Sequence, residues 1–312
     1  MADTQDQFAS IMTPDPGSEH KLRVYGRNVS SPWRFPLTYP SEFQEPDLVL
    51  SVDPHLSETA DADQAWVRHE TLPDGSDHID FQNLFAFTVS PDGTAIRCLL
   101  RRAATMTSLQ AYLFGQVMSF ALLKMGAEPI HATVLELEGV GVALMGQPGM
   151  GKSTLAAGLL REGCRLLTDD LMVLQGPRLM VQPGVSRLKL FPEAATRLLP
   201  VKGEPMNPIT PKLVLPLAGP LFASLPVPLR HIYVLRAGTG DRVTIRTLSR
   251  RSGFLELTRN TFNTSIDVPQ RLEQQFRAAA DVAAKVSVKS LTYLRDFEML
   301  PTVVERILRD IS

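Results

Sequence analysis

Gly146-Gln147-Pro148-Gly149-Met150-Gly151-Lys152-Ser153 is the stretch that decides the fold of this 312-residue chain. It satisfies the pattern G-x-x-x-x-G-K-[ST] of a phosphate-binding loop. The glycines let backbone N–H groups wrap closely around a phosphate at the positive end of the following helix. Lys152 supplies a mobile point charge for the β- and γ-phosphates, and the Ser153 hydroxyl is a ligand for Mg²⁺. We therefore predict a nucleotide site formed by this loop and the next residue, Thr154.

The sequence on both sides of the loop predicts a strand before it and a helix after it. Two apolar runs, His131 to Leu137 and Val140 to Met145, flank Glu138-Gly139, a pair suited to a tight turn. The helix predicted from Ser153 to Arg161 is amphipathic, and Gly163 is placed to end it. Further strands are predicted at Cys164 to Thr168, Leu171 to Leu174, Leu179 to Gln182, His231 to Leu235 and Val243 to Leu248, and helices from Gln270 to Ala284 and Leu300 to Ile311. This order favours an α/β fold.

Asp169-Asp170 follows the first strand after the helix of the loop. A carboxylate at the end of a strand beside a phosphate loop can hold Mg²⁺ directly or through water. One of two adjacent carboxylates can also accept the proton of an attacking hydroxyl or water. A solvated turn rich in Asp is the alternative interpretation of the same residues.

Three further polar residues near the loop are candidates with open alternatives. His131 opens the strand that leads into the hairpin, and a lone His is more often structural than catalytic. Arg187 and Lys189 alternate with Leu188 and Leu190, so on a strand both cations lie on one face. They could hold a nucleotide or substrate phosphate, and a solvated strand face fits them equally well.

The residues before the loop predict a separate domain. Residues 1–19 are rich in Asp, Gln, Ser and Pro without apolar periodicity, which is typical of a disordered segment. Residues 20–127 predict a small β-rich α+β domain with a helix from Leu109 to Met125, capped by Thr107 or Ser108, that joins it to the domain of residues 128–312. Eight of the 24 prolines lie between Pro200 and Pro228, so we expect residues 200–228 to form an irregular lid or insertion.

The composition narrows the classes of partner. The 32 basic and 33 acidic residues give a net charge of -1, which provides no global field for nucleic acid or an anionic membrane. The two cysteines, Cys98 and Cys164, form no metal or redox pattern and suit a reducing cytosol. The longest apolar stretch, Leu109 to Met125, contains Gln, Ser and Lys, which are costly in a membrane. We expect a soluble, cytoplasmic protein with no nucleic-acid or membrane partner.

The segments around the loop resemble HPr kinase/phosphorylase, on the runs Ile130-His131-Ala132-Thr133-Val134, Gly141-Val142-Ala143-Leu144-Met145, the loop, and Arg165-Leu166-Leu167-Thr168-Asp169-Asp170. In that family a His precedes the loop, and the first Asp of a pair serves as general base or acid at the seryl oxygen. The resemblance implies a P-loop kinase domain of the HPr kinase type with mixed sheet and helices, and ATP and Mg²⁺ as cofactors. It implies Asp169 as the base, Asp170 as a metal or supporting residue, and His131 as a partner of the base. HPr kinases are hexamers, which makes a homo-oligomer a possibility.

The run Val185-Ser186-Arg187-Leu188-Lys189-Leu190-Phe191-Pro192 departs from the signature of bacterial family members, which has an acidic residue and an Arg next to glycines. The strand with Arg187 and Lys189, followed by Phe191-Pro192-Glu193, is similar to that of HPr-kinase-like proteins encoded with ribosomal peptide pathways, notably lasso peptide kinases. These phosphorylate a serine of the precursor peptide, typically at its C-terminus. The leading hypothesis is therefore an ATP-dependent serine kinase whose partner is a peptide with an acceptor Ser. The alternatives are a nucleotide-sensing module, an HPr-type kinase/phosphorylase and an ATPase with water as acceptor.

Overall fold

The computed structural model describes residues 19–53, 66–262 and 269–311. The chain divides into two compact units, which we call unit 1 (Met1–Ala127 with Pro205–Asn207) and unit 2 (Glu128–Glu204 with Pro208–Ser312). The predicted disordered segment, residues 1–19, lies outside the described residues except for Glu19.

Unit 1 is built on one sheet of eight strands, in the order β3-β1-β2-β4-β8-β7-β6-β5. Its strands are β1 (His20–Val24), β2 (Arg27–Ser31), β3 (Tyr39–Pro40), β4 (Leu48–Val52), β5 (Val67–Thr71), β6 (Asp77–Phe81), β7 (Phe85–Val89) and β8 (Ala95–Leu100). The predicted hairpin is present, since β7 and β8 pair antiparallel with Phe87 opposite Cys98. Strand β7 is buried along its whole length, which accounts for its continuous apolar sequence.

The helix predicted from Leu109 to Met125 is not continuous. The structure has α2 (Met106–Tyr112), a π-helical stretch η1 (Leu113–Val117) and α3 (Met118–Lys124). Gly115 adopts φ -109° and ψ -106°, outside the helical region, and interrupts the regular hydrogen bonding. The predicted cap was also wrong: Thr105 is the N-cap, and Ser108 forms the other half of a capping box with it. Thr105, two positions before Thr107, accepts a hydrogen bond from the free N–H of Ser108.

Unit 2 contains a nine-stranded mixed sheet and a separate three-stranded sheet. Its elements are β9 (Ile130–Leu137), β10 (Val140–Met145), α4 (Lys152–Arg161), β11 (Arg165–Thr168), β12 (Leu171–Met172), β13 (Leu174–Gln175), β14 (Met180–Val181), β15 (Arg187–Leu190), α5 (Pro192–Leu198), β16 (Glu204–Pro205), β17 (Leu213–Pro216), η2 (Gly219–Leu221), β18 (Val227–Ala237), β19 (Thr244–Thr247), α6 (Arg250–Arg259), α7 (Pro269–Lys285), β20 (Ser287–Tyr293) and α8 (Leu300–Ile311). The central strands β10, β18 and β20 run parallel, β9 pairs antiparallel with β10, and β11 pairs antiparallel with β9. The predicted mixed α/β class is confirmed.

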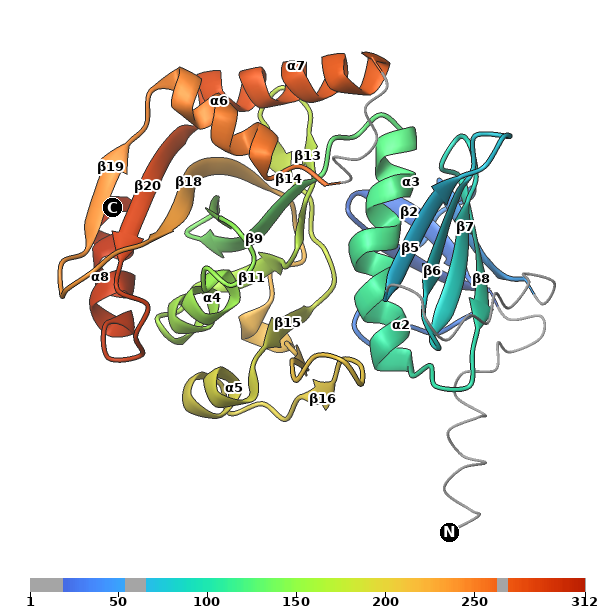
Figure 1. Ribbon diagram of the computed structural model, residues 1–312, viewed down its shortest axis with the longest axis horizontal. Coiled ribbons are helices and arrows are strands. Elements are labelled where there is room, and N and C mark those ends of the chain that lie inside the picture. Colours follow the sequence, from blue (N-terminus) through green and yellow to red (C-terminus); the bar gives the residue numbers. More distant parts are fainter. Residues whose placement is uncertain (1–18, 54–65, 263–268, 312) are drawn as a thin grey trace, which may run out of the picture. The chain divides into compact units, whose positions relative to one another are not determined.

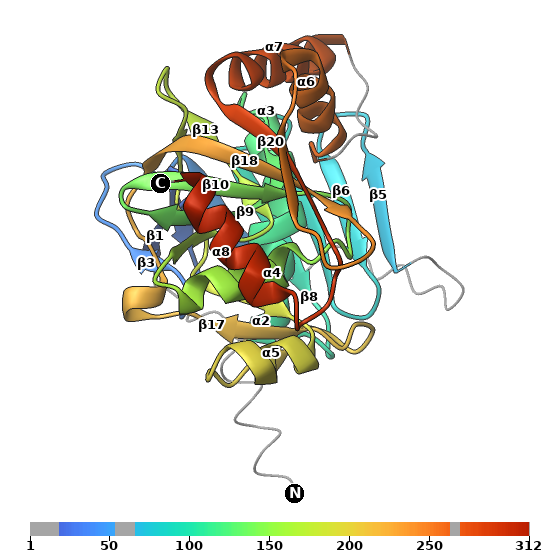
Figure 2. The same ribbon diagram turned by 90° about the vertical axis from the view of Figure 1, so that its left-hand side faces the viewer.

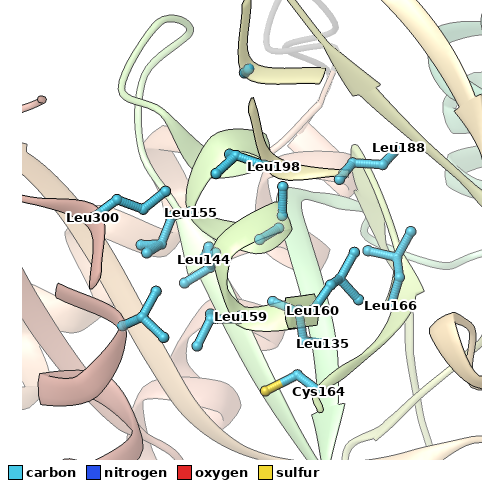
Figure 3. Close-up of a cluster of buried hydrophobic side chains, with 14 of the residues drawn as sticks. Leu135, Leu144, Leu155, Leu159, Leu160, Cys164, Leu166, Leu188, Leu198 and Leu300 are labelled. Carbon is cyan, nitrogen blue, oxygen red and sulfur yellow. The ribbon is translucent and has the colours of Figure 1, made fainter. Parts of the chain in front are cut away.

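Helices cover both faces of the large sheet of unit 2, with α4 and α8 on one face and α6 and α7 on the other (Figures 1 and 2). Each face has its own apolar core. Leu155 and Leu159 of α4 pack toward Leu135 and Leu144 of the sheet (Figure 3). Each of these leucines is almost completely buried, which stabilises the unit by about 1.5–3 kcal/mol per side chain. This packing fixes α4, and with it the loop that precedes α4.

The proline-rich segment contains more regular structure than we predicted for residues 200–228. Strand β17 lies inside it and pairs antiparallel with β15, and β18 already begins at Val227. Pro216 ends β17, and Pro228 pairs with Met180 where β18 meets the short strand β14. Prolines at strand ends and sheet edges remove no hydrogen bond that the sheet needs, so the proline density did not exclude strands. Among the described residues, no helix is both long and apolar enough to span a membrane.

Candidate nucleotide and phosphoryl-transfer site

The phosphate-loop sequence connects the end of β10 to the start of α4 in unit 2. Gly146, Gly149 and Gly151 have φ values of 144°, 84° and 88°, a range that favours glycine. A Cβ on Gly146 would lie 3.3 Å from the carbonyl oxygen of Leu235, so the neighbouring strand also limits this position to a small residue. Gly151 is the N-cap of α4 and provides no side-chain cap. The first N–H groups of α4 are therefore open to an anionic ligand.

The end of β20 supports the loop from the side. The Tyr293 hydroxyl donates to the carbonyl oxygen of Met150 at 3.4 Å, and Arg295 donates to the carbonyl oxygen of Gly149. Burial raises the pKa of Tyr293 to about 12, so its hydroxyl keeps the proton that it donates. The sequence analysis predicted neither residue as part of the site, because both lie more than 140 positions after the loop.

Lys152 is buried, with 8% of its surface exposed. Its ammonium donates to the carbonyl oxygen of Gly146 at 2.6 Å, which holds it across the mouth of the loop. Burial lowers the pKa of Lys152, while the negative charges of Asp169 and Asp170 act in the opposite direction. The lysine of the loop and the carboxylate pair thus lie close enough to interact.

Asp169 is held at both carboxylate oxygens. The Thr133 hydroxyl donates to Oδ1 at 2.7 Å, and the backbone N–H of Lys189 donates to Oδ2 at 3.2 Å. Burial raises the pKa of Asp169, and the charge of Asp170 adds to this effect. A carboxyl group with a raised pKa binds a proton more readily than an ordinary aspartate, as a general base requires.

Asp170 also lies beside Lys189, but its pKa is shifted in the opposite direction. Burial opposes its ionisation, but the positive charges of Lys189 and Arg187 outweigh burial and hold its pKa well below the usual range. Lys189 forms an ion pair with its carboxylate. The φ of Asp170 is 74°, a conformation in which a non-glycine residue is strained and which is often found at functional sites. The pKa values of two adjacent carboxyl groups are thus shifted in opposite directions.

His131 lies on β9, where it is opposite Leu171 of β12. Its Nδ1 lies 3.1 Å from the carbonyl oxygen of Asp170. Since a carbonyl only accepts, Nδ1 carries the proton and Nε2 is left as an acceptor. Burial lowers the pKa of His131, and the charge of Lys152 adds to this effect, so both disfavour the charged ring. The imidazole contacts the backbone of the carboxylate pair rather than the Asp169 carboxylate itself.

Arg187 and Lys189 lie on one face of β15, as the alternation predicted. Leu188 and Leu190 point into the core with α4, while the two cations face the carboxylate pair. Arg187 is 2% exposed and Lys189 is half-buried, so the interpretation as a solvated strand face was wrong. Both cations lie beside the carboxylates that they stabilise.

Ser153 and Thr154 lie in the first turn of α4 and are half-buried. The Ser153 hydroxyl and the Asp170 carboxylate are hard oxygen donors of the kind that Mg²⁺ prefers. A nucleotide-bound Mg²⁺ takes only one or two protein ligands and fills its other positions with phosphate oxygens and water. The residues present therefore fit this ion.

Thr133 is the functional contact on β9 that the sequence analysis missed. It is 1% exposed and lies two positions after His131, on the same face of the strand. The alternation of a strand could have indicated it, because any residue that shares the face of His131 near Asp169 is a possible partner. A buried hydroxyl bound to Asp169 fixes the orientation of that carboxylate.

Residues 125–182 match the family model described as the HPr Serine kinase C-terminal domain. The HPr kinase/phosphorylase of Exiguobacterium sp. is 32% identical over 110 residues, which are 34% of this chain and 31% of the relative. The HPr kinase/phosphorylase of Lactobacillus acidophilus is 49% identical over 41 residues, 13% of each chain. The matches thus span less than a third of these relatives.

A solved structure, the Hpr(Ser) kinase/phosphatase from Coxiella burnetii, aligns with 59% of this chain and 95% of its own, with a TM-score of 0.32 and 12% identity. The family-model match contains the loop, His131 and both aspartates, and it ends before Arg187. Residues 125–182, which include the phosphate loop, are therefore similar to the HPr Serine kinase C-terminal domain.

Proposed function

We propose that this chain is an ATP-dependent kinase that transfers the γ-phosphate to the hydroxyl of a serine in a peptide. The observation that carries the proposal is the division of roles between two neighbouring carboxylates beside the loop lysine. Asp169 has a raised pKa and Asp170 a lowered one. A pair of titratable groups with pKa values moved apart is the usual sign of a base next to a permanently charged partner.

Each of these residues has a role in the proposed transfer. The loop and Lys152 hold the β- and γ-phosphates of ATP, and Thr133 and the N–H of Lys189 orient Asp169. The seryl oxygen forms a bond to the γ-phosphorus, the bond from that phosphorus to the β,γ-bridging oxygen breaks, and ADP leaves. Asp169 accepts the seryl proton. A magnesium ion held by Ser153 and Asp170 would neutralise charge on the phosphates.

We further propose that the acceptor is the C-terminal serine of a lasso peptide precursor and that the reaction takes place in the cytoplasm. This rests on the similarity of the strand with Arg187 and Lys189, followed by Phe191-Pro192-Glu193, to the peptide kinases of such pathways. The run from Val185 to Pro192 lacks the glycines and the acidic residue of the HPr kinase signature, which favours a peptide over HPr as acceptor.

The test is to incubate the protein with ATP, Mg²⁺ and the precursor peptide encoded beside its gene. We expect the peptide to gain the mass of one phosphate, with the modified residue located by fragmentation at the terminal serine. The matched control peptide carries Ala in place of that serine and should stay unmodified. ATP consumption without any mass gain would exclude the kinase assignment and favour an ATPase.

A further inference from the structure

The ribbon formed by β15 and β17 has one apolar face and one basic face. Leu188 pairs with Leu215 and Leu190 with Leu213, and these side chains belong to or pack against the core beneath α4. Side chains alternate along a strand, so the residues between them lie on the other face. That face carries Arg187 and Lys189, the two cations that act on Asp170.

Lys212 extends the basic face by one residue beyond β17. In the register that pairs Leu190 with Leu213, Lys212 lies opposite Phe191. The Lys212 ammonium lies 5.4 Å from the centroid of the Phe191 ring, which confirms that both side chains are on the same side of the ribbon. The proline-rich sequence of residues 200–228 did not predict that Lys212 lies on this face of the ribbon.

The surroundings of Lys212 differ from those of Lys189. In residues 19–53, 66–262 and 269–311, no carboxylate lies within ion-pair distance of Lys212, whereas Lys189 is paired with Asp170. The contact of Lys212 with Phe191 is a cation–π interaction, which is weak at an exposed site. Phe191 is 49% exposed. The Lys212 ammonium is thus held in place but can be redirected to a stronger partner.

Lys212 also lies near the ammonium of the phosphate loop. Lys212 and Lys189 share one face of the ribbon, where Lys189 pairs with Asp170 beside the loop, and both lie within electrostatic range of Lys152. Mutual repulsion between lysines is unfavourable in the free protein and is relieved when an anion lies between them. The group that the loop lysine is expected to bind there is the terminal phosphate.

We propose that Lys212 is a second phosphate-binding lysine that contacts the γ-phosphate of ATP from the β15–β17 ribbon, with Phe191 positioning it. This inference rests on the proposed function, because it assumes that a nucleoside triphosphate occupies the loop. A lysine suits this position because its compact charge can follow the phosphoryl group as it leaves ADP.

The test compares binding of Mg·ATP and Mg·ADP by calorimetry in the wild type and in Lys212→Met. The variant loses a charge-assisted contact to the γ-phosphate, so it should bind ATP about 10-fold more weakly, which corresponds to about 1.4 kcal/mol. Its affinity for ADP should stay within about 2-fold, since ADP lacks the contacted group. Lys212→Arg keeps the charge and should recover most of the preference for ATP. Phe191→Leu should weaken ATP binding by less than Lys212→Met does.

The matched control is Lys202→Met, which removes an exposed lysine of the same proline-rich segment and should change neither affinity. Equal losses for ATP and ADP, or no loss for either, would overturn the assignment of Lys212, as would a wild type that binds both nucleotides equally. Thermal unfolding of each variant checks that the unit stays folded. The experiment needs no acceptor, so an ATP preference that depends on Lys212 would hold even if no peptide were phosphorylated.

Discussion

Buried carboxylates occur in both units, and their surroundings differ. In unit 1, Asp80 forms a two-pronged ion pair with Arg101, and Asp77 contacts Lys124 at 3.0 Å and His69 at 2.7 Å. Each of these carboxylates has its counter-charge within the unit.

In unit 2, two carboxylates, Asp169 and Asp170, lie among four cations, Lys152, Arg187, Lys189 and Lys212. An excess of positive charge in a partly buried site is unfavourable unless an anion joins it. From this difference we infer that the charge count around a buried carboxylate can distinguish a structural ion pair from a site for an anionic ligand.

Replacing Asp169 should give the largest change in activity if the carboxylates and cations of unit 2 form a catalytic site. In Asp169→Asn the amide cannot accept the seryl proton, so the rate of peptide phosphorylation should fall about 10²- to 10⁴-fold. ATP affinity should change little, because the carboxylate is not a phosphate ligand. Single-turnover rates measured by mass spectrometry, together with ATP titration, check this. A variant that phosphorylates at the wild-type rate would show that Asp169 is not the base.

The pH dependence of the same variant pair refines the assignment. Because the pKa of Asp169 is raised, its carboxylate is protonated at a higher pH than an ordinary aspartate. The wild-type rate should therefore fall as the pH drops through that raised pKa, and Asp169→Asn should lose this acidic limb.

Replacing Asp80 should disrupt one of the structural ion pairs of unit 1, the pair with Arg101. Asp80→Ala leaves the Arg101 guanidinium buried without its carboxylate, which should lower the free energy of unfolding by about 3 kcal/mol. Urea unfolding followed by fluorescence measures this. By contrast, Asp169→Asn should leave stability nearly unchanged, since it removes a buried charge whose ionisation burial opposes. Equal losses of stability in the two variants would remove the distinction between the two regions.

The sequence predicted the elements around the phosphate loop closely, because local signals determine them. The apolar run before Gly146 and the Lys at the start of the following helix lie where β10 ends and α4 begins. The helix predicted from Leu300 to Ile311 has the same bounds as α8. The roles of the residues in the loop, of Asp169 and of Asp170 stay predictions until binding and activity are measured.

Contacts between distant segments were beyond the reach of the sequence. Strand β20 and helix α6 were not predicted, and the loop is contacted by Tyr293 at the end of β20 and by Arg295, two residues after it. Lys212 was hidden in a segment whose prolines suggested irregular structure, although β17 begins at the next residue. Such contacts depend on sheet register, which one sequence does not reveal.

Glu128 tests whether a one-to-one ion pair in unit 2 behaves like those of unit 1. It contacts Arg271 at 3.1 Å, and burial raises its pKa to about 7 although Arg271 acts in the opposite direction. The folded protein therefore keeps a proton on Glu128 between about pH 4.5 and 7 that the unfolded chain releases. The stabilisation from this group is fully present below pH 4.5 and is lost as the pH rises through about 7.

The variant Glu128→Gln should remove this loss, so its free energy of unfolding should decline less than that of the wild type between pH 5 and pH 7. Urea unfolding at several pH values measures both curves. Parallel curves would show that Glu128 does not titrate in this range and that Arg271 keeps it ionised.

The smallest effect is expected for an exposed pair, which has charges but no burial. Lys285 and Asp281 form an ion pair one turn apart on α7 at 2.7 Å, and both side chains are nearly half exposed. Asp281→Asn should change the free energy of unfolding by less than about 0.5 kcal/mol, because solvent screens the pair. The same urea titration used for Asp80→Ala measures it. The contrary result is that Asp281→Asn lowers the free energy of unfolding as much as Asp80→Ala does. In that case pairing rather than burial would determine what a carboxylate contributes to stability. The number of cations around Asp169 and Asp170 would then not distinguish them from the ion pairs of unit 1.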